Sequence, residues 1–120
     1  MCFFDHTNKR GQNPTDRANQ AGYTCRKSFG SYYTDGIGEN IFQHNTYNSG
    51  TYGIIFLGYI PVPYGFFDYN DEEELSESIV DGWMDSPGHR ENILTPNFDR
   101  EGVGIVKTGD SKIYITQNFC

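Results

Sequence analysis

Apolar and polar residues alternate along two segments near the end of the chain, residues 101–107 and 112–119. Alternation with a period of two places the apolar side chains on one face of a β-strand. Residues 108–111, between the two segments, have the sequence TGDS, which is typical of a turn. The pattern therefore predicts a β-hairpin at the end of the chain.

A helical period precedes this hairpin. Leu75, Ile79 and Trp83 follow one another at intervals of four residues, which places them on one face of a helix. Acidic residues at 71–74 favour the start of that helix because they complement its dipole. We predict a helix from about residue 71 to residue 84, with the apolar stripe and Trp83 in the core.

Shorter patterns predict the remaining elements. Residues 13–15 (NPT) favour the start of a helix that Gly22 would end. Residues 23–34 mix aromatic and basic side chains and predict a loop with some extended character, and residues 41–43 predict a short strand that leaves a turn at Glu39. Helices, irregular segments and a terminal hairpin together predict an α+β fold.

Composition restricts the class of protein. The chain has 120 residues, which suits a single domain with a modest core, and its 16% aromatic content supplies large buried surfaces. Nine basic residues stand against 16 acidic ones, a net charge of −7 that disfavours nucleic acid and anionic membrane surfaces as partners. No apolar run approaches the roughly 20 residues of a membrane span.

A histidine at the start of a helix is the first candidate for chemistry. Ser86 is a favourable N-cap, and Pro87 is favoured at the first helical position. His89 then falls in the first turn, where the helix dipole favours a neutral imidazole. Such an imidazole is able to bind a metal or accept a hydrogen bond, although packing alone would also explain it.

Further motifs accompany that histidine. His6 follows two aromatic residues in the sequence FFDH, and Glu39 stands in GIGENI, residues 36–41. Residues 83–90 (WMDSPGHR) and 114–119 (YITQNF) complete the series.

Taken in this order, the motifs resemble the CAP superfamily of secreted proteins (cysteine-rich secretory, antigen 5 and pathogenesis-related proteins), in its prokaryotic branch. The resemblance runs from His6 to Cys120, apart from about residues 43–74. It implies that His6 and His89 are the two cavity histidines and that Glu39 is the acid of the Gly-Glu-Asn signature.

The resemblance also implies a fold. We expect residues 1–120 to form a single CAP domain, an α-β-α sandwich around a central antiparallel sheet. Since a CAP domain normally carries another helix before the equivalent of His6, we expect that N-terminal helix to be absent and the domain to be truncated. Residues 44–70, rich in Gly, Tyr, Phe and Pro, are longer than the usual connection. They are expected to be an aromatic insertion, a β-hairpin or an ordered loop over the cleft, whose rings either recognise a partner or pack onto the domain.

Three cysteines, Cys2, Cys25 and Cys120, allow one disulfide and leave one thiol over. The resemblance implies an extracellular or cell-surface location, which favours a bridge, although no signal peptide is recognisable in the chain. Cys25–Cys120 is the preferred pair, because a bridge there would anchor the end of the last strand.

Two histidines and a glutamate suit an open zinc site, so zinc is the candidate cofactor, with His6, Glu39 and His89 as ligands. The family pattern carries a second glutamate where this chain has Ser86, and Asp85 is the nearby substitute. We expect Asp85 and Ser86 to support this site, together with Asn40, which follows Glu39 in the Gly-Glu-Asn signature.

Three functions compete. The first expectation is a secreted or cell-surface binding module whose His/Glu cleft holds a divalent metal, a lipid, a sterol or another small ligand, or which meets an extracellular protein partner, without turnover. The alternatives are a metal-dependent hydrolase that uses the same cleft and a non-catalytic structural surface domain.

Overall fold

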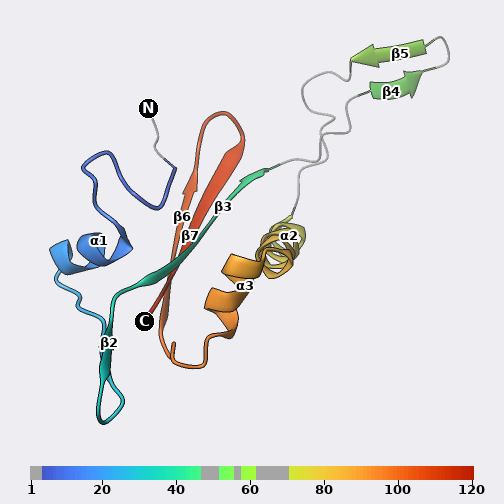
Figure 1. The fold of residues 1–120 in the computed structure, drawn as a ribbon. Helices are drawn as coiled ribbons and strands as arrows, with labels where there is room; N and C mark the ends of the chain where they lie inside the picture. Colours follow the sequence, from blue (N-terminus) through green and yellow to red (C-terminus); the bar gives the residue numbers. More distant parts are fainter. Residues whose placement is uncertain (1–3, 47–51, 56–57, 62–70) are drawn as a thin grey trace.

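The computed structural model describes residues 4–46, 52–55, 58–61 and 71–120 of the chain (Figure 1). Helices and antiparallel strands together confirm the α+β class. In chain order the elements are α1 (Pro14–Gln20), β1 (Arg26–Ser28), β2 (Tyr33–Asp35), β3 (Gly38–Asn45), β4 (Tyr52–Ile55), β5 (Gly58–Pro61), α2 (Glu72–Asp85), α3 (Pro87–Leu94), β6 (Glu101–Lys107) and β7 (Lys112–Phe119).

The main sheet has the order β3-β7-β6, with both pairs antiparallel and β7 in the centre. The predicted terminal hairpin is confirmed, and its turn includes Ser111 at a φ of 60°. The prediction for β3 was wrong in extent, because the strand begins at Gly38 and places Glu39 inside a strand instead of a turn. Pairing with β7 along its whole length satisfies the peptide groups of β3, so polar residues extend the strand beyond its apolar centre.

Helix α2 supplies the core, as the apolar stripe predicts. It begins with a capping box between Asp71 and Glu74, which satisfies backbone donors of the first turn. Ile79 and Trp83 are buried, and they pack with Ile115 of β7 in the hydrophobic cluster.

Close packing of α2 on the sheet depends on Gly82, because a Cβ there would stand 2.5 Å from the ring of Phe42. The indole nitrogen of Trp83 also donates a hydrogen bond to the carbonyl oxygen of Ile41 at 3.1 Å. Trp83 is therefore fixed in the core, as predicted.

Helix α3 begins as predicted, with Ser86 at the N-cap position and Pro87 at the first turn. The Ser86 side chain, however, makes no capping hydrogen bond. Ser86 is also the C-cap residue of α2, so its backbone is shared between two helices. Its N–H donates to the Trp83 carbonyl at 3.2 Å, and its carbonyl accepts from the N–H of Arg90 at 2.8 Å.

The N-terminal part of the chain forms α1 and the small β1–β2 hairpin (Figure 1). A capping box between Asn13 and Asp16 starts α1, and Gly22 follows its end at a φ of +83°, as the sequence predicts. A disulfide joins Cys25 to Cys120, the pair favoured from the sequence, with a Cα–Cα distance of 5.7 Å. It ties the base of the hairpin to the end of β7.

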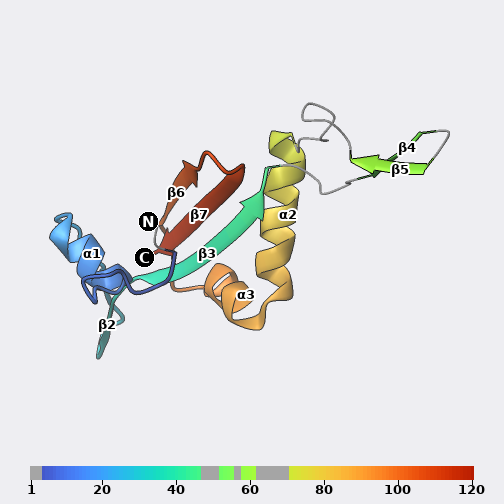
Figure 2. The ribbon, with the colours of Figure 1, turned by 90° about the horizontal axis from the view of Figure 1, so that it is seen from above.

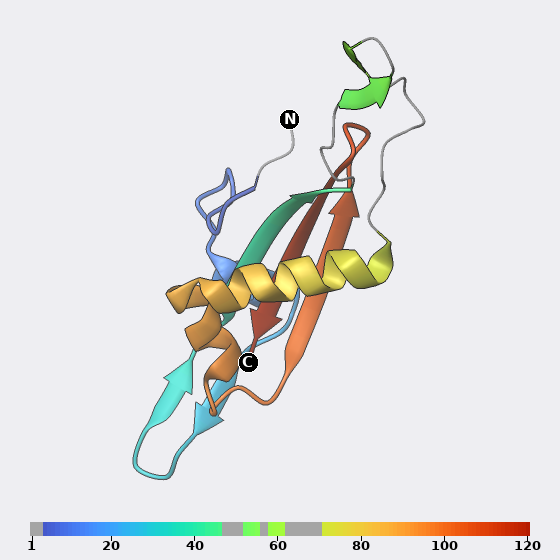
Figure 3. The same ribbon diagram turned by 90° about the vertical axis from the view of Figure 1, so that its right-hand side faces the viewer.

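The helices α2 and α3 cross the main sheet on one side in Figure 3, and Figure 2 shows α1 at the other end of β3 from the N-terminus of α2. The three-layer sandwich stays a prediction. Within the expected insertion at 44–70, β4 and β5 pair as an antiparallel hairpin, and most of the remaining residues lie outside the described ones. None of the described helices has the length and apolar character that crossing a membrane requires.

Candidate functional site

A buried carboxylate lies at the start of β3. The Glu39 side chain is only 3% exposed. One of its oxygens accepts a hydrogen bond from the guanidinium of Arg17 at 2.5 Å, and the other lies 3.0 Å from Nδ1 of His6. A buried carboxylate requires such partners, because its transfer out of water is otherwise unfavourable. The structure therefore brings two of the three predicted site residues together, with Arg17 as a third member.

Arg17 connects three segments. Besides Glu39, its guanidinium donates to the backbone carbonyls of His6 at 2.8 Å and Gln12 at 3.1 Å. The Arg17 side chain thereby holds the segment before α1 against the sheet. The sequence analysis missed this residue, and an arginine in a short helix carries no local signal that a distant glutamate is its partner.

Asn40, the next residue of β3, lies on the other face of the strand and contacts α3. It is fully buried, at 0% exposure. Its amide nitrogen donates to the backbone carbonyl of His89 at 3.1 Å and to the Gln117 side chain at 3.4 Å, while its oxygen accepts from the Asn92 amide at 2.9 Å. Because these bonds use both ends of the amide, Asn40 fixes α3 to the sheet.

His89 contacts the sheet through its backbone, at Asn40. Successive side chains of a strand point to opposite faces, so Glu39 and Asn40 meet different parts of the molecule. The Nδ1 atom of His89 is buried and finds no hydrogen-bond partner within the described residues. The structure thus pairs His6 with Glu39 and leaves His89 beside Asn40.

The other two supporting residues lie at the junction of α2 and α3. Asp85 ends α2 and is exposed, and Ser86 is the junction residue itself. Within the described part of the chain, neither side chain hydrogen-bonds to Glu39 or His6. Asp85 therefore does not replace the missing second glutamate in this arrangement.

As arranged, these side chains do not fit a zinc ion. Among the described residues, no three His, Cys, Asp or Glu side chains are grouped closely enough to hold a metal. Both oxygens of Glu39 are engaged, and the positive charge of Arg17 beside them opposes a second cation. The Nδ1 atom of His89, which no described residue hydrogen-bonds, would supply only one of the several ligands that zinc needs.

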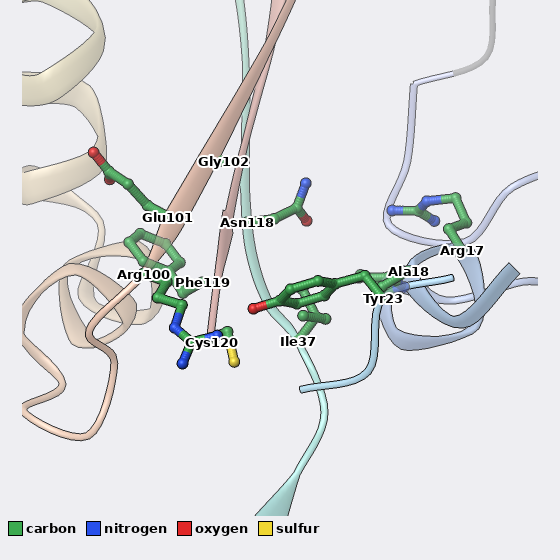
Figure 4. A pocket seen from close by; sticks show the side chains of 11 residues that line it. Arg17, Ala18, Tyr23, Ile37, Arg100, Glu101, Gly102, Asn118, Phe119 and Cys120 are labelled. Atoms are coloured by element: carbon green, nitrogen blue, oxygen red, sulfur yellow. The ribbon is translucent and has the colours of Figure 1, made fainter. Parts of the chain in front are cut away.

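A pocket of about 520 Å³ lies between α1 and the β6–β7 end of the sheet (Figure 4). Its wall includes Arg17, so it adjoins the buried cluster around Glu39. In Figure 4 the Tyr23 ring reaches across the pocket toward the side where Arg100 and Cys120 lie. The lining residues are Pro14, Arg17, Ala18, Tyr23, Ile37, Arg100, Glu101, Gly102, Asn118, Phe119 and Cys120.

This pocket combines an apolar lining with the accessible guanidinium of Arg100. Ala18, Ile37 and Phe119 supply apolar surface, while the guanidinium of Arg17 is occupied by Glu39. The Arg100 side chain is 69% exposed and only 3.7 Å from the carboxylate of Asp99. The arrangement suits a ligand with an apolar body and a polar or anionic end.

Comparison with known proteins identifies the family. The family model of CAP, the cysteine-rich secretory protein family, matches residues 1–119. The chain is also 35% identical over 107 residues to the Bacillus subtilis (strain 168) protein described as "Uncharacterized protein YkwD". That match covers 86% of this chain but only 40% of the relative's length. No solved structure matches the chain. The chain belongs to the CAP family of cysteine-rich secretory proteins.

Proposed function

We propose that this chain is an extracellular or cell-surface CAP binding module whose pocket between α1 and the β6–β7 end holds a small amphiphilic ligand, such as a lipid. The observation that carries the proposal is the pocket of about 520 Å³ with its apolar lining and Arg100 at its wall. A volume of that size lies within the range of small-molecule sites. The Cys25–Cys120 disulfide supports the location, because such bonds persist in oxidising compartments.

Family membership supports the finer arrangement of the fold as part of this proposal. We place α1 and the pocket in one outer layer, and α2 and α3 in the other, around the main sheet. The opposite directions of Glu39 and Asn40, which contact α1 and α3 respectively, support this sandwich. We further propose that residues 44–70 form an insertion, with the β4–β5 hairpin inside it.

Binding of a fluorescent fatty acid tests the proposal, with a blocking variant of the pocket. Ala18→Phe places a ring in the pocket and should weaken binding by at least about tenfold, since filling the pocket excludes the apolar body of the ligand. Ala21→Phe is the matched control, because Ala21 is the exposed C-cap residue of the same helix and does not line the pocket. Equal weakening by both variants, or no binding by the wild type, would contradict the proposal.

The head group is tested separately. Arg100→Gln should weaken binding of the fatty acid several-fold and leave binding of a neutral sterol unchanged, because only the first ligand carries a negative end. Arg90→Gln is the control, since Arg90 lies on α3 and donates to the carbonyl of Met84, away from the pocket. An unchanged affinity for the fatty acid in Arg100→Gln would assign the head group to a different residue.

A metal-dependent hydrolase that uses His6, Glu39 and His89 is the alternative function. The Nδ1 atom of His89 favours it, because this nitrogen is buried, has no hydrogen-bond partner among the described residues and is able to bind a ligand. The present engagement of Glu39 with Arg17 opposes it. A hydrolysis screen with and without chelator, beside zinc calorimetry, tests it. Turnover that chelator abolishes and Glu39→Gln removes would favour the hydrolase. If the protein showed no turnover and bound no ligand, the result would favour a structural surface domain.

A further inference from the structure

The outer backbone edge of strand β6 has no strand partner in the described part of the chain. This strand is the last in the order β3-β7-β6, and no other strand of the described residues pairs with it. At one end of the β6–β7 ladder, Arg100 and Cys120 exchange two hydrogen bonds, at 3.1 and 3.0 Å. At the other end, the N–H of Thr108 donates to the carbonyl of Lys112 at 2.9 Å.

These bonds fix the direction of every backbone group in β6. In an antiparallel ladder, hydrogen-bonded and non-hydrogen-bonded pairs alternate along the strand. Since residues 100 and 108 bond to the β7 side, the even-numbered residues between them do so as well. The N–H and C=O groups of Glu101, Val103, Ile105 and Lys107 therefore point outward from the sheet.

The side chains of β6 are also exposed to solvent. Every residue of the strand is exposed, and the apolar ones are 57% (Val103), 62% (Ile105) and 59% (Val106) exposed. Natural sheets usually protect an edge with a proline, a bulge or an inward-pointing charge. Residues 101–107 contain no proline, and charges stand only at the two ends. The strand therefore offers a ready template for another strand.

The sequence of β6, EGVGIVK, is complementary to itself when it runs antiparallel about Gly104. In that register Glu101 of one copy faces Lys107 of the other, and Val103 faces Ile105. Residues directly opposite in an antiparallel pair share a face, so both pairings bring matching side chains together. The outward backbone groups named above also belong to these residues, so every one of them gains a partner.

The glycines fit the same register. Gly104 faces Gly104 of the second copy in a non-hydrogen-bonded pair, where backbones approach most closely. Gly102 faces Val106, and a Cβ at Gly102 would find no atom within 4 Å, so there is open space for the valine. Self-pairing therefore introduces no like-charge contact and no steric clash along the strand.

We propose that two copies of this chain associate through β6, antiparallel and centred on Gly104, so that their main sheets join into one continuous sheet. A second copy is the occupant because it supplies the complementary charges at both ends of the strand. One strand pair buries less than a standard interface, so the dimer is reversible and weak. This inference does not rest on the ligand proposed above.

Sedimentation at increasing protein concentration tests the dimer, in a Cys2→Ser background that prevents cross-linking through the third cysteine. The wild-type surface should give a monomer–dimer equilibrium that Ile105→Lys abolishes, because it places a lysine opposite Val103 at both symmetric positions. Leu94→Lys is the matched control, since Leu94 is also 62% exposed but lies at the end of α3. A wild type that stays monomeric, or a dimer lost in Leu94→Lys and kept in Ile105→Lys, would overturn the proposal.

A charge exchange tests the register independently of folding. Glu101→Lys alone and Lys107→Glu alone each create two like-charge pairs across the interface and should weaken the dimer roughly tenfold. The double variant Glu101→Lys/Lys107→Glu restores opposite charges and should return the dissociation constant to within about threefold of wild type. Failure of the double variant to recover, while it remains folded by circular dichroism, would refute this register.

Amide hydrogen exchange gives a third readout. On dimer formation the outward amides of residues 101, 103, 105 and 107 should become protected, whereas those of residues 102, 104 and 106 are already bonded to β7. Concentration-dependent protection that alternates along the strand supports the proposal. Protection of another element in its place would assign the interface elsewhere.

Discussion

The two faces of the main sheet are held by different forces. On the face toward α2, Ile79, Trp83 and Ile115 form an apolar cluster. On the face toward α1, the buried ion pair between Arg17 and Glu39 lies beside a pocket, and the Phe4 ring packs edge-on against Tyr114. Apolar packing extends over a helix and two strands, whereas the ion pair depends on one side chain from each partner.

Neighbouring residues of one motif divide between these faces. Asn40 holds α3 through a fully buried amide, and Glu39 holds α1 through a carboxylate. The Gly-Glu-Asn signature thus contains one residue that supports the core and one that organises the pocket side. This division predicts that loss of Asn40 destabilises the whole domain, while loss of the ion pair loosens the N-terminal segment.

Asn40→Ala should have the largest effect. It removes the partners of the His89 carbonyl and of the Asn92 amide in a buried position, so the free energy of unfolding should fall by about 3 kcal/mol. Urea denaturation measures the loss. Asn97→Ala is the control, because Asn97 is exposed, and should stay within about 0.5 kcal/mol. A loss below about 1 kcal/mol for Asn40→Ala would remove its supporting role.

The same division separates what the sequence predicts from what it does not. Helix α2 and the β6–β7 hairpin follow from local periodicity, since the apolar stripe of Leu75, Ile79 and Trp83 needs no knowledge of distant residues. The extent of β3 depends on its partner β7, which lies more than 60 residues further along the chain. Backbone pairing at that distance leaves no local pattern.

The candidate site shows the same limit. Motif order alone selects His6 and Glu39, which lie in contact. It does not reveal Arg17, because a salt bridge depends on how α1 docks and not on sequence spacing. It also places His89 at the correct helical position without indicating that its backbone faces Asn40. Side-chain direction across a sheet is set by strand parity, which requires the true bounds of β3.

Arg17→Met should have an intermediate and local effect. Breaking a buried ion pair typically costs 3–5 kcal/mol. Arg17 is 31% exposed, so solvent screens part of the interaction, and we expect about 2 kcal/mol. Amide exchange should accelerate over residues 6–20 and remain unchanged in α2. Acceleration in α2 to the same degree would contradict the division between the two faces.

A double-mutant cycle sharpens that result. Glu39→Gln removes the charge but keeps the shape of the side chain. The double variant Arg17→Met/Glu39→Gln should therefore lose less free energy of unfolding than the sum of the two single losses. A second cycle, in which Gln12→Ala takes the place of Glu39→Gln, is the control, because Arg17 donates to the backbone carbonyl of Gln12 and not to its side chain. Additive losses for Arg17→Met and Glu39→Gln would show that the two side chains act independently.

The smallest effect is expected at the exposed edge of the fold, where Lys27 of β1 meets Asp99. The ammonium of Lys27 hydrogen-bonds to the Asp99 carboxylate at 2.6 Å, and this bond lowers the pKa of Asp99 below its ordinary value. Because the folded pKa is depressed, the contact stabilises the fold at pH values above the ordinary aspartate pKa. The stabilisation is lost as pH falls through the folded value.

Lys27→Met should therefore raise the pKa of Asp99 toward its ordinary value, as measured by NMR titration of the carboxyl carbon. Asp110 is the internal control, because its pKa is lowered mainly by a hydrogen bond from Thr108, with Lys112 contributing, and neither residue changes in the variant. The stability difference between wild type and Lys27→Met should decrease in acid, once Asp99 is protonated in both proteins, and the part that remains should come from the hydrogen bond of Lys27 to the Asn97 carbonyl at 2.7 Å. If the pKa of Asp99 were the same in Lys27→Met as in wild type, this surface contact would not hold the β1–β2 hairpin. The Cys25–Cys120 disulfide would then be its main attachment to the end of the sheet.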